Sequence, residues 1–286
     1  MANKDSIIKN LDEMKIMSSK NTVIYSALTD SYDNILDPKT LPKNTDYILF
    51  TDDPTRINSK IWKTKKINFS YRDPRRLAKI FKILPHYFFP NYKYSIWVDS
   101  NIEIINDLND LIKISFENND EFIAFFHHPD RSCIYDEAKN IINLGYSRKK
   151  IVLDQINHYK KLNYPKNNGL IAGRFIIRKH NNKKCIELMK KWWEEIDNYS
   201  IRDQLSFNFS CWKKDMNYST IDLNHFNNSY FAIHPHKKLK FYNQKGYYKI
   251  SFNTIKASLY HYITKNRLYL KYLRKYYLYL KSILKM

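Results

Sequence analysis

The pattern of hydrophobic and polar positions along the chain predicts strands that alternate with helices. Two apolar runs, residues 22–28 and 45–51, have the length and the β-branched and aromatic content of strands. Residues 94–98, 121–126 and 169–179 are typical of three more strands. Strands and helices that alternate in this way indicate an α/β sandwich built on a mixed, mostly parallel central sheet.

Helical spacing of apolar residues marks the segments between these strands. In residues 75–88, apolar side chains fall at 77, 80, 81 and 84, with Arg76, Lys79 and Lys82 beside them. Four further segments are predicted as helices: 135–144, 147–162, 182–196 and 202–214. No internal repeat is visible in the sequence.

Polar residues follow four of the predicted strands at the point where each strand ends. They are Asp30, the pair Asp52 and Asp53, Asp99, and the pair His127 and His128. In open α/β sheets, ligands bind at the carboxyl edge of the strands, so these residues are candidates for a site. Turn residues at strand ends are the alternative interpretation.

The stretch Asp99-Ser100-Asn101 directs a carboxylate and an amide oxygen to the same side of an extended segment. Both groups are ligands for a hard cation such as Mn²⁺ or Mg²⁺, which commonly shares its coordination shell with substrate phosphates. Arg76 and Lys79, one helical turn apart, are candidates to hold the same phosphates. Two solvated helix charges are the alternative for this pair.

Composition and charge restrict the class of protein. The 286 residues include 43% hydrophobic residues, enough for one large domain, alone or with an appendage. Three scattered cysteines without a CxxC pair favour a reducing compartment. With no signal-peptide pattern and no long apolar run, we expect a cytoplasmic protein. The formal charge of +21 suggests nucleic acid, an anionic membrane or a phosphorylated substrate as partner.

Five segments occur in an order that resembles a known family: YSALTDSYD, DYILFTDD, RRLAKIFKILPHYFFPNYKYSIWVDSNIEI, FFHHPDRSCIYDEA and RDQLSF. The family consists of glycosyltransferase-like proteins, formerly a domain of unknown function, and includes plant Golgi proteins linked to mucilage and bacterial and viral relatives. The resemblance covers residues 22–213. It implies a GT-A fold, a Rossmann-like sandwich that binds a nucleotide-sugar and carries an Asp-x-Asp-type metal motif after a central strand.

The resemblance also implies roles for individual residues. Ala27, Thr29 and Tyr32 are expected to lie against the nucleotide, and Asp52 near the base or ribose. Asp99 and Asn101 occupy the metal motif, and Asp99 also faces the donor. Asn101 stands where an aspartate is usual, so one formal charge is lost, and we expect either low metal affinity or a metal that is dispensable.

Two later segments are rich in groups capable of chemistry. We expect the loop 126–137 to face the acceptor through His127, His128 and Arg131, the alternative being a capped helix behind a solvated loop. At the start of the helix 202–214, Asp203 is predicted to be the general base of an inverting transfer. A helix-capping acid is the alternative for Asp203. As a third metal ligand we favour His234 over His236 and His261.

The last residues of the chain are basic and aromatic. On a helical projection of 263–286, six of the seven bases gather on an arc of about 120°, and leucines, tyrosines and Ile283 fill the opposite side. This pattern is typical of a helix that lies on an anionic membrane surface; a helix packed on its own domain is the alternative. No nucleic-acid-binding motif is visible, so we expect no nucleic-acid partner.

The sequence therefore predicts three parts: an N-terminal extension 1–20, a GT-A glycosyltransferase domain 21–256 and a basic amphipathic tail 257–286. We expect a sugar to pass from a nucleotide-sugar to a saccharide or lipid-linked saccharide, in surface polysaccharide or lipopolysaccharide synthesis, on the inner face of the membrane. The rival interpretations are a metal-dependent phosphohydrolase or nuclease, and a basic module without catalytic activity that binds nucleic acid or membrane.

Overall fold

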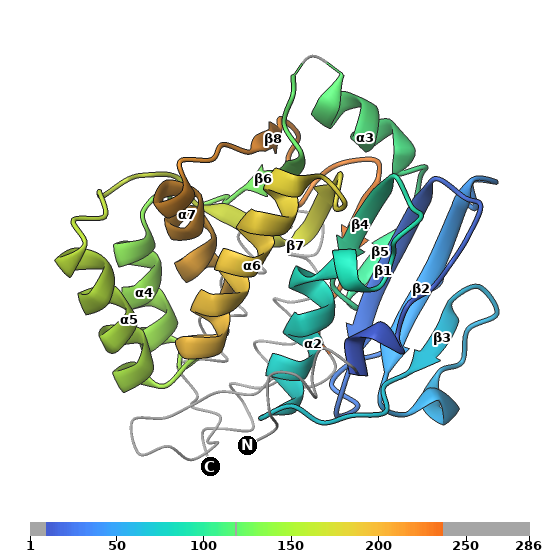
Figure 1. The fold of residues 1–286 in the computed structure, drawn as a ribbon, viewed down its shortest axis with the longest axis horizontal. Coiled ribbons are helices and arrows are strands. Elements are labelled where there is room, and N and C mark those ends of the chain that lie inside the picture. Colours follow the sequence, from blue (N-terminus) through green and yellow to red (C-terminus); the bar gives the residue numbers. More distant parts are fainter. Residues whose placement is uncertain (1–9, 118, 237–286) are drawn as a thin grey trace, which may run out of the picture.

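The computed structural model describes residues 10–117 and 119–236, and their centre is a seven-stranded sheet in the order β3-β2-β1-β4-β7-β6-β8 (Figure 1). Of these seven strands, β7 alone runs antiparallel to its neighbours. The predicted mixed, mostly parallel sheet is confirmed. The strands are β1 (Thr22–Leu28), β2 (Thr45–Thr51), β3 (Lys63–Lys66), β4 (Tyr94–Val98), β6 (Ile123–His127), β7 (Ile171–Arg178) and β8 (Ser219–Ile221).

Helices cover both faces of the sheet. α2 (Pro74–Ile83), α6 (Lys183–Asn198) and α7 (Asp203–Lys214) pack on one face (Figure 1). α3 (Asn109–Phe116) packs on the other, beside a small antiparallel sheet of β5 (Ile102–Ile104) and β9 (Phe231–Ile233). Short 3₁₀ turns occur at Pro54–Arg56 and Pro85–Tyr87.

The apolar strands read from the sequence are apolar because both of their faces are buried. In β1, Val23 and Tyr25 join the core beneath α2 and α6, while Ile24 joins the core on the α3 side. Parallel strands sandwiched between helices have no solvent face, so a continuous run replaces alternation. β1 and β2 accordingly begin and end at the residues that the pattern predicts.

The orientation of α2 is fixed at its start and on its buried side. Asp73 caps the helix by accepting hydrogen bonds from the backbone N–H groups of Arg75 and Arg76, and Pro74 follows at the first helical position. Near its end, the buried guanidinium of Arg178 donates to the backbone oxygen of Lys82 at 2.8 Å. These contacts set which face of α2 points toward the carboxyl edge of β1 and β4.

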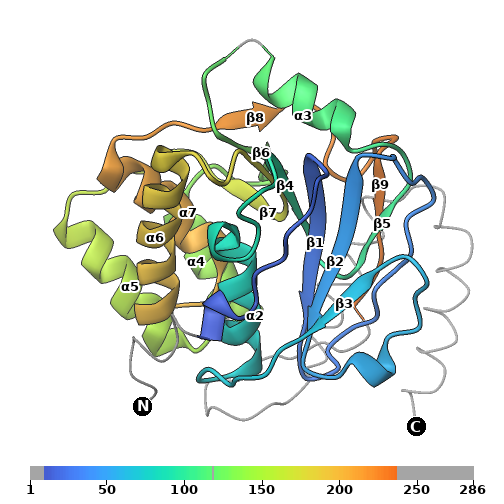
Figure 2. The same cartoon turned by 45° about the vertical axis from the view of Figure 1, so that its right-hand side comes forward.

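A helical hairpin, α4 (Ile134–Asn143) and α5 (Lys149–Lys161), is inserted between β6 and β7 (Figure 2). Its apolar residues form a third core cluster together with Leu205 and Phe209 of α7. The loop between the two helices therefore reaches the same edge of the molecule as the start of α7.

The described part of the predicted N-terminal extension contributes to the core, where Leu11 and Met14 are buried with α2 and α6. The predicted tail 257–286 lies outside the described residues, as does His261. Within the described ranges, every helix is too short or too polar to span a bilayer.

Candidate functional site

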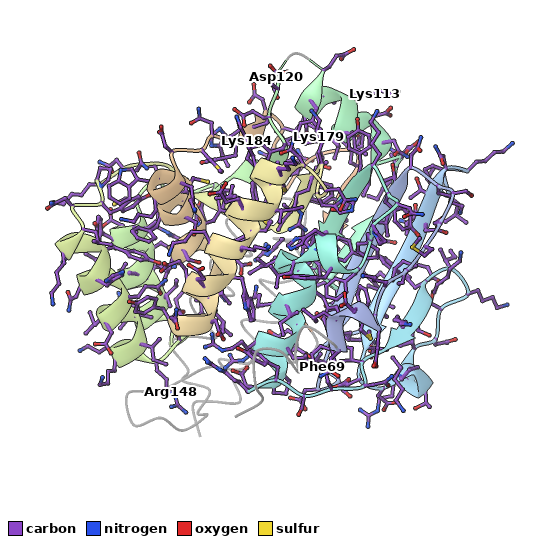
Figure 3. The ribbon with its side chains drawn as sticks, in the orientation of Figure 1. Phe69, Lys113, Asp120, Arg148, Lys179 and Lys184 are labelled. Carbon is purple, nitrogen blue, oxygen red and sulfur yellow. The ribbon has the colours of Figure 1, made fainter. Side chains whose placement is uncertain are left out.

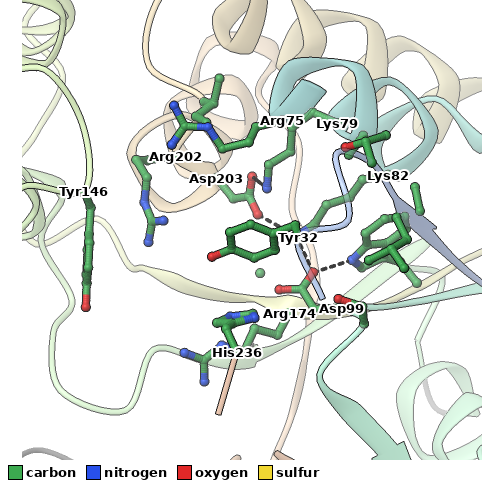
Figure 4. Close-up of a pocket in the computed structure, with 18 of the residues that line it drawn as sticks. Tyr32, Arg75, Lys79, Lys82, Asp99, Tyr146, Arg174, Arg202, Asp203 and His236 are labelled. Carbon is green, nitrogen blue, oxygen red and sulfur yellow. Dashed lines mark hydrogen bonds and ion pairs between the residues drawn. The ribbon is translucent and has the colours of Figure 1, made fainter. Parts of the chain in front are cut away.

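A cavity of about 280 Å³ opens at the carboxyl edge of β1 and β4, beside α2 and the start of α7. This is the edge at which the polar strand ends of the sequence predict a site. The side chains at its centre come from segments far apart in the chain, as the close-up in Figure 4 shows. The described residues that line it include Ala27, Thr29, Tyr32, Arg75, Lys79, Lys82, Trp97, Asp99, Tyr146, Gly173, Arg174, Arg202, Asp203 and His236.

Two lysines of α2 and two aspartates form a charged network in this cavity (Figure 4). Lys79 Nζ lies 2.6 Å from Asp203 Oδ1, and Lys82 Nζ lies 2.6 Å from Asp203 Oδ2. Lys82 Nζ is also 3.2 Å from Asp99 Oδ1, which accepts a further hydrogen bond from Trp97 Nε1 at 2.7 Å. The network joins the end of β4 to the start of α7 through α2.

For three of the four groups, the charges of the partners outweigh the effect of burial on the pKa. Burial would raise the pKa of Asp203, but Lys79 and Lys82 hold it well below the usual range of a carboxyl group. Burial likewise opposes the ionised form of Asp99, and the same two lysines lower its pKa. Burial disfavours the charged form of Lys82, yet the two carboxylates raise its pKa. For Lys79 burial prevails and lowers the pKa to about 8.

Contacts from β7 and from α2 together fix the position of the Asp203 carboxylate. A Cβ atom added at Gly173 of β7 would come within 2.9 Å of Asp203 Oδ2, so the glycine makes room for the carboxylate. Asp203 is also the first residue of α7, where a negative charge is favoured by the helix dipole. A ligand can therefore reach the Asp203 carboxylate only from the cavity.

The two late histidines have different partners. His236 lines the cavity, and its Nδ1 lies 2.7 Å from Oδ2 of the buried Asp33. His234, which the sequence favours as metal ligand, lies 3.0 Å from Glu103 Oε2 through Nε2 and does not line the cavity. The structure thus brings Asp99 together with His236 rather than with His234.

Asn101 is buried, and its side chain is turned toward the end of β9. Its Nδ2 donates to the backbone oxygen of His234 at 2.6 Å, whereas its buried Oδ1 has no hydrogen-bond partner among the described residues. An unpaired buried oxygen next to Asp99 suits a cation ligand, and a histidine oriented by a carboxylate is the usual arrangement at metal sites.

Asp99 and His236 line the cavity and offer a carboxylate and an imidazole to a divalent cation, whereas Asn101 does not line it and offers its unpaired amide oxygen from the buried side. Within the described ranges, no three His, Cys, Asp or Glu side chains are grouped closely enough to form a metal cage by themselves. A cation at this set would have to complete its shell with ligand oxygens.

The residues predicted to meet the nucleotide lie at the end of β1. Ala27, Thr29 and Tyr32 line the cavity, with Thr29 Oγ1 donating to the backbone oxygen of Pro74 at 2.8 Å. Asp30 and Ser31 adopt left-handed backbone conformations, with φ of 56° and 47°, which turn the chain back toward the site.

Asp52 lies in a neighbouring cavity of about 480 Å³ between the ends of β1 and β2. Its Oδ2 accepts a hydrogen bond from the backbone N–H of Asp30 at 2.8 Å, which fixes the turn after β1. Asp33, Asp53 and Arg56 line the same cavity. The two cavities share Leu28 and are therefore adjacent.

Of the two basic residues predicted to hold phosphate, the structure brings only Lys79 to the cavity. The guanidinium of Arg76 donates to the backbone oxygens of Ile196 and Tyr199 and so ties α2 to the end of α6. Arg75 lines the cavity instead. On α2, positions 75, 79 and 82 lie on the face that borders the cavity, whereas position 76 lies on the adjacent face, which contacts the end of α6.

The residues predicted to contact the acceptor do not line the cavity. His127 is exposed, and Arg131 Nε pairs with the buried Glu137 at 2.5 Å. His128 Nδ1 accepts hydrogen bonds from the backbone N–H groups of Asp130 and Arg131. Burial raises the pKa of Glu137, although Arg131 opposes this effect. These side chains are therefore bonded to other residues of the same loop and helix start, and not to the cavity.

Several lining residues were not predicted from the sequence. The 75, 79, 82 spacing on one predicted helix was an available signal for Arg75 and Lys82. Arg174 is at the centre of β7, and nothing local distinguishes it from a core strand residue. Burial lowers the pKa of Arg174, against the opposing effect of Asp99. Tyr146 faces Arg202, whose guanidinium carbon lies 5.1 Å from the centre of the ring.

A family model and a curated relative point to the same family of proteins. A family model described as "TOD1/MUCI70, glycosyltransferase-like domain" matches residues 2–239. A curated relative, "Probable hexosyltransferase MUCI70" of Arabidopsis thaliana, is 25% identical over 229 residues, which are 70% of this chain and 39% of the relative. The chain thus spans about two fifths of the length of that relative.

Solved structures show a distant likeness. The bifunctional glycosyltransferase WbbM matches 68% of this chain and 38% of its own at 10% identity and a TM-score of 0.42. The galactosyltransferase LgtC, in complex with donor and acceptor sugar analogues, matches 69% of this chain and 70% of its own at 8% identity and a TM-score of 0.39.

Proposed function

Because the chain belongs to the TOD1/MUCI70 glycosyltransferase-like family, we propose that it transfers a hexose from a nucleotide-sugar donor to a saccharide or lipid-linked saccharide acceptor. One observation carries this proposal. Asp99, Lys79, Lys82 and Asp203 converge in a single cavity at the carboxyl edge of the parallel strands. Cations for a diphosphate and a carboxylate for an acceptor hydroxyl are the groups that this reaction needs.

The donor is proposed to span both cavities. Its nucleoside lies between the ends of β1 and β2 near Asp52, and its diphosphate lies over Ala27 and Thr29 within reach of Lys79. The sugar then points toward Asp203 and Tyr146. Lysine and arginine side chains suit this position because they neutralise phosphate charge in a partly buried site.

The proposed cofactor is Mn²⁺ or Mg²⁺ held by Asp99 and Asn101, with His236 as the third protein ligand instead of His234. When bound, the cation neutralises the charge on the departing diphosphate. With one carboxylate and one amide as oxygen ligands, we propose weak binding that is strengthened by the donor's phosphates.

Asp203 is proposed as the general base that takes the proton of the acceptor hydroxyl in an inverting transfer. Its low pKa keeps it ionised at neutral pH, which is the protonation state that a base requires. Asp203→Asn is expected to lower turnover by about 10²-fold or more. Retention of anomeric configuration in the product, read by proton NMR, would exclude the inverting role.

We further propose that the acceptor belongs to surface polysaccharide or lipopolysaccharide synthesis and that the tail 257–286 holds the protein on the inner face of an anionic membrane. The support is the separation of basic and aromatic residues in the tail sequence. Deletion of 262–286 is expected to abolish flotation with anionic vesicles at low salt while donor hydrolysis remains. Equal flotation of the full and the truncated chain contradicts the membrane role.

The rival hydrolase or nuclease interpretation calls for carboxylates that share a metal ion. Here Lys82 Nζ lies between Asp99 and Asp203 and bonds to both, so an ammonium group occupies the position between the two carboxylates. This arrangement favours one cation site on the Asp99 side and a separate role for Asp203.

The test is a donor screen in the presence and absence of Mn²⁺. The protein is incubated with a panel of nucleotide-sugars and saccharide acceptors, and released nucleoside diphosphate and product mass are measured. Asp99→Ala is expected to abolish both. Lys184→Met, which changes an exposed residue near the start of α6 (Figure 3) that does not line the cavity, is expected to keep wild-type rates. Near-wild-type turnover in Asp99→Ala contradicts the proposed function.

A further inference from the structure

Asp203 has a property that conflicts with immediate action as a base: both of its oxygens are already engaged. Oδ1 pairs with Lys79 and Oδ2 with Lys82, each at 2.6 Å, and the carboxylate is buried. A carboxylate has about four lone-pair sites, but two ammonium hydrogen bonds stabilise its ionised form and make it a poor proton acceptor. Removal of one of the two lysines would make Asp203 a stronger base.

Lys82 is the lysine that stays. Its side chain is 1% exposed, and it holds a second carboxylate, Asp99, at 3.2 Å. Its ammonium also lies 5.4 Å from the centre of the Trp97 ring. Moving this ammonium would take the cation that they share from the buried Asp203 and from the half-buried Asp99, which is costly.

Lys79 is the lysine that can move. Its side chain is 20% exposed, and in the described part of the chain its ion-pair partner is Asp203. An ammonium group has three N–H donors, so Lys79 retains donors for a ligand in the cavity that it lines. The flexible four-carbon stem of lysine also allows the ammonium group to change position.

We propose that Lys79 is an exchangeable ligand: in the free protein it holds Oδ1 of Asp203, and when the donor binds, its Nζ moves to the donor diphosphate and leaves Oδ1 free for the acceptor hydroxyl. This inference rests on the proposed function. It assigns Lys82 as a positioning residue, which keeps Asp99 and Asp203 at a fixed separation throughout.

In the transfer that follows, the acceptor oxygen forms its bond to the anomeric carbon while the bond from that carbon to the phosphate oxygen breaks. The nucleoside diphosphate leaves with the electron pair, and the acceptor proton passes to Asp203 Oδ1. Lys79 stays protonated and neutralises the leaving diphosphate. Since Asp203 is freed only after the donor arrives, we expect the donor to bind before the acceptor.

The exchange has a measurable consequence, because donor binding has to break the ion pair between Lys79 and Asp203. Asp203→Asn weakens that pair, so it is expected to raise the affinity for UDP or GDP by roughly tenfold, within the range of coupling between contacting residues. Lys79→Met is expected to lower the affinity by about tenfold, as loss of one charge-assisted hydrogen bond does. In the Lys79→Met background, Asp203→Asn is expected to change it by less than about twofold.

Isothermal titration calorimetry of the full chain and its three variants with UDP and GDP, in Mn²⁺, completes this cycle. Equal gains from Asp203→Asn in both backgrounds indicate a simple charge effect and overturn the exchange. Affinity of the single Asp203→Asn variant for UDP and GDP that is unchanged or weaker than wild type also overturns the exchange. Absence of binding by any nucleoside diphosphate contradicts the proposed function itself, which separates the two failures.

A second measurement keeps the test independent of how well Asp203→Asn folds. The wild-type protein is treated with an amine-acylating reagent, and acylation of Lys79 is followed by mass spectrometry. UDP or GDP, in contrast to the corresponding monophosphates, is expected to protect Lys79, while Lys184 serves as the exposed control. Unchanged labelling of Lys79 in the presence of saturating diphosphate shows that Lys79 stays on Asp203 and overturns the proposal.

Discussion

The imidazole of His236 and the carboxylate of Asp33 lie 2.7 Å apart, Nδ1 to Oδ2, although 203 residues separate them in the chain. Asp33 also accepts a hydrogen bond from Ser100 Oγ at 3.2 Å, so one carboxylate contacts both the histidine and the loop that follows β4. This contact keeps His236 at the cavity with its Nε2 available as a ligand.

We predict that His236→Ala lowers Mn²⁺ affinity by about tenfold or more, because a ligand is lost. The matched variant is His234→Ala, which removes a histidine two residues away that pairs with Glu103 outside the cavity. Its Mn²⁺ affinity is expected to stay within about twofold of wild type, as read by calorimetry in the presence of nucleoside diphosphate. The reverse order of the two variants would restore His234 as the ligand.

Asn101→Asp tests the metal motif by adding a ligand instead of removing one. The substitution adds a carboxylate ligand, but it removes the hydrogen bond from Nδ2 to the backbone oxygen of His234 and brings two acceptors together. Without metal we expect the free energy of unfolding to fall by about 1–3 kcal/mol, the usual cost of an unsatisfied buried group. Mn²⁺ is expected to recover part of this loss in thermal melts. A melting temperature that ignores Mn²⁺ would place residue 101 outside the coordination shell.

The two lysines of α2 are predicted to differ in their effect on stability. Lys82→Met leaves Asp99 and Asp203 without the cation that they share, and is expected to cost about 3–5 kcal/mol of unfolding free energy. Lys79→Met removes a partly exposed cation while Lys82 remains on Asp203, so we expect a loss of about 1 kcal/mol. Urea denaturation measures both, and equal losses would contradict the distinction between a fixed and a movable lysine.

The pKa of Lys79, lowered to about 8 by burial, predicts a pH dependence of nucleotide binding. Below that pH Lys79 is protonated and can bind a diphosphate; above it the ammonium loses its charge. UDP or GDP affinity is therefore expected to fall as the pH rises through 8. Lys79→Arg, which stays charged, is expected to remove this fall. Identical profiles for the two proteins would exclude Lys79 as the titrating group.

Local sequence was sufficient for much of the sheet and for one face of the site. β1, β2 and β4 are apolar runs that end in polar residues, so their bounds and the position of Asp99 followed from pattern alone. Strand β3 has the sequence KTKK and is largely exposed, so it carries no hydrophobic signal. β5, β8 and β9 have three residues each, too few to establish a period. Helix α3 was likewise not predicted.

By itself, then, the sequence determined the sandwich, the edge that carries the candidate site and the side chains available there. It could do so because burial and helical period are visible in the order of neighbouring residues. Only the tertiary structure decided which residues meet. Lys82 pairs with Asp203, 121 positions away, while Arg76 turns to the end of α6. His236 faces the cavity, and His234 pairs with Glu103 instead. Such choices depend on the packing of α2 and α7 against the sheet, a long-range property that no local spacing records.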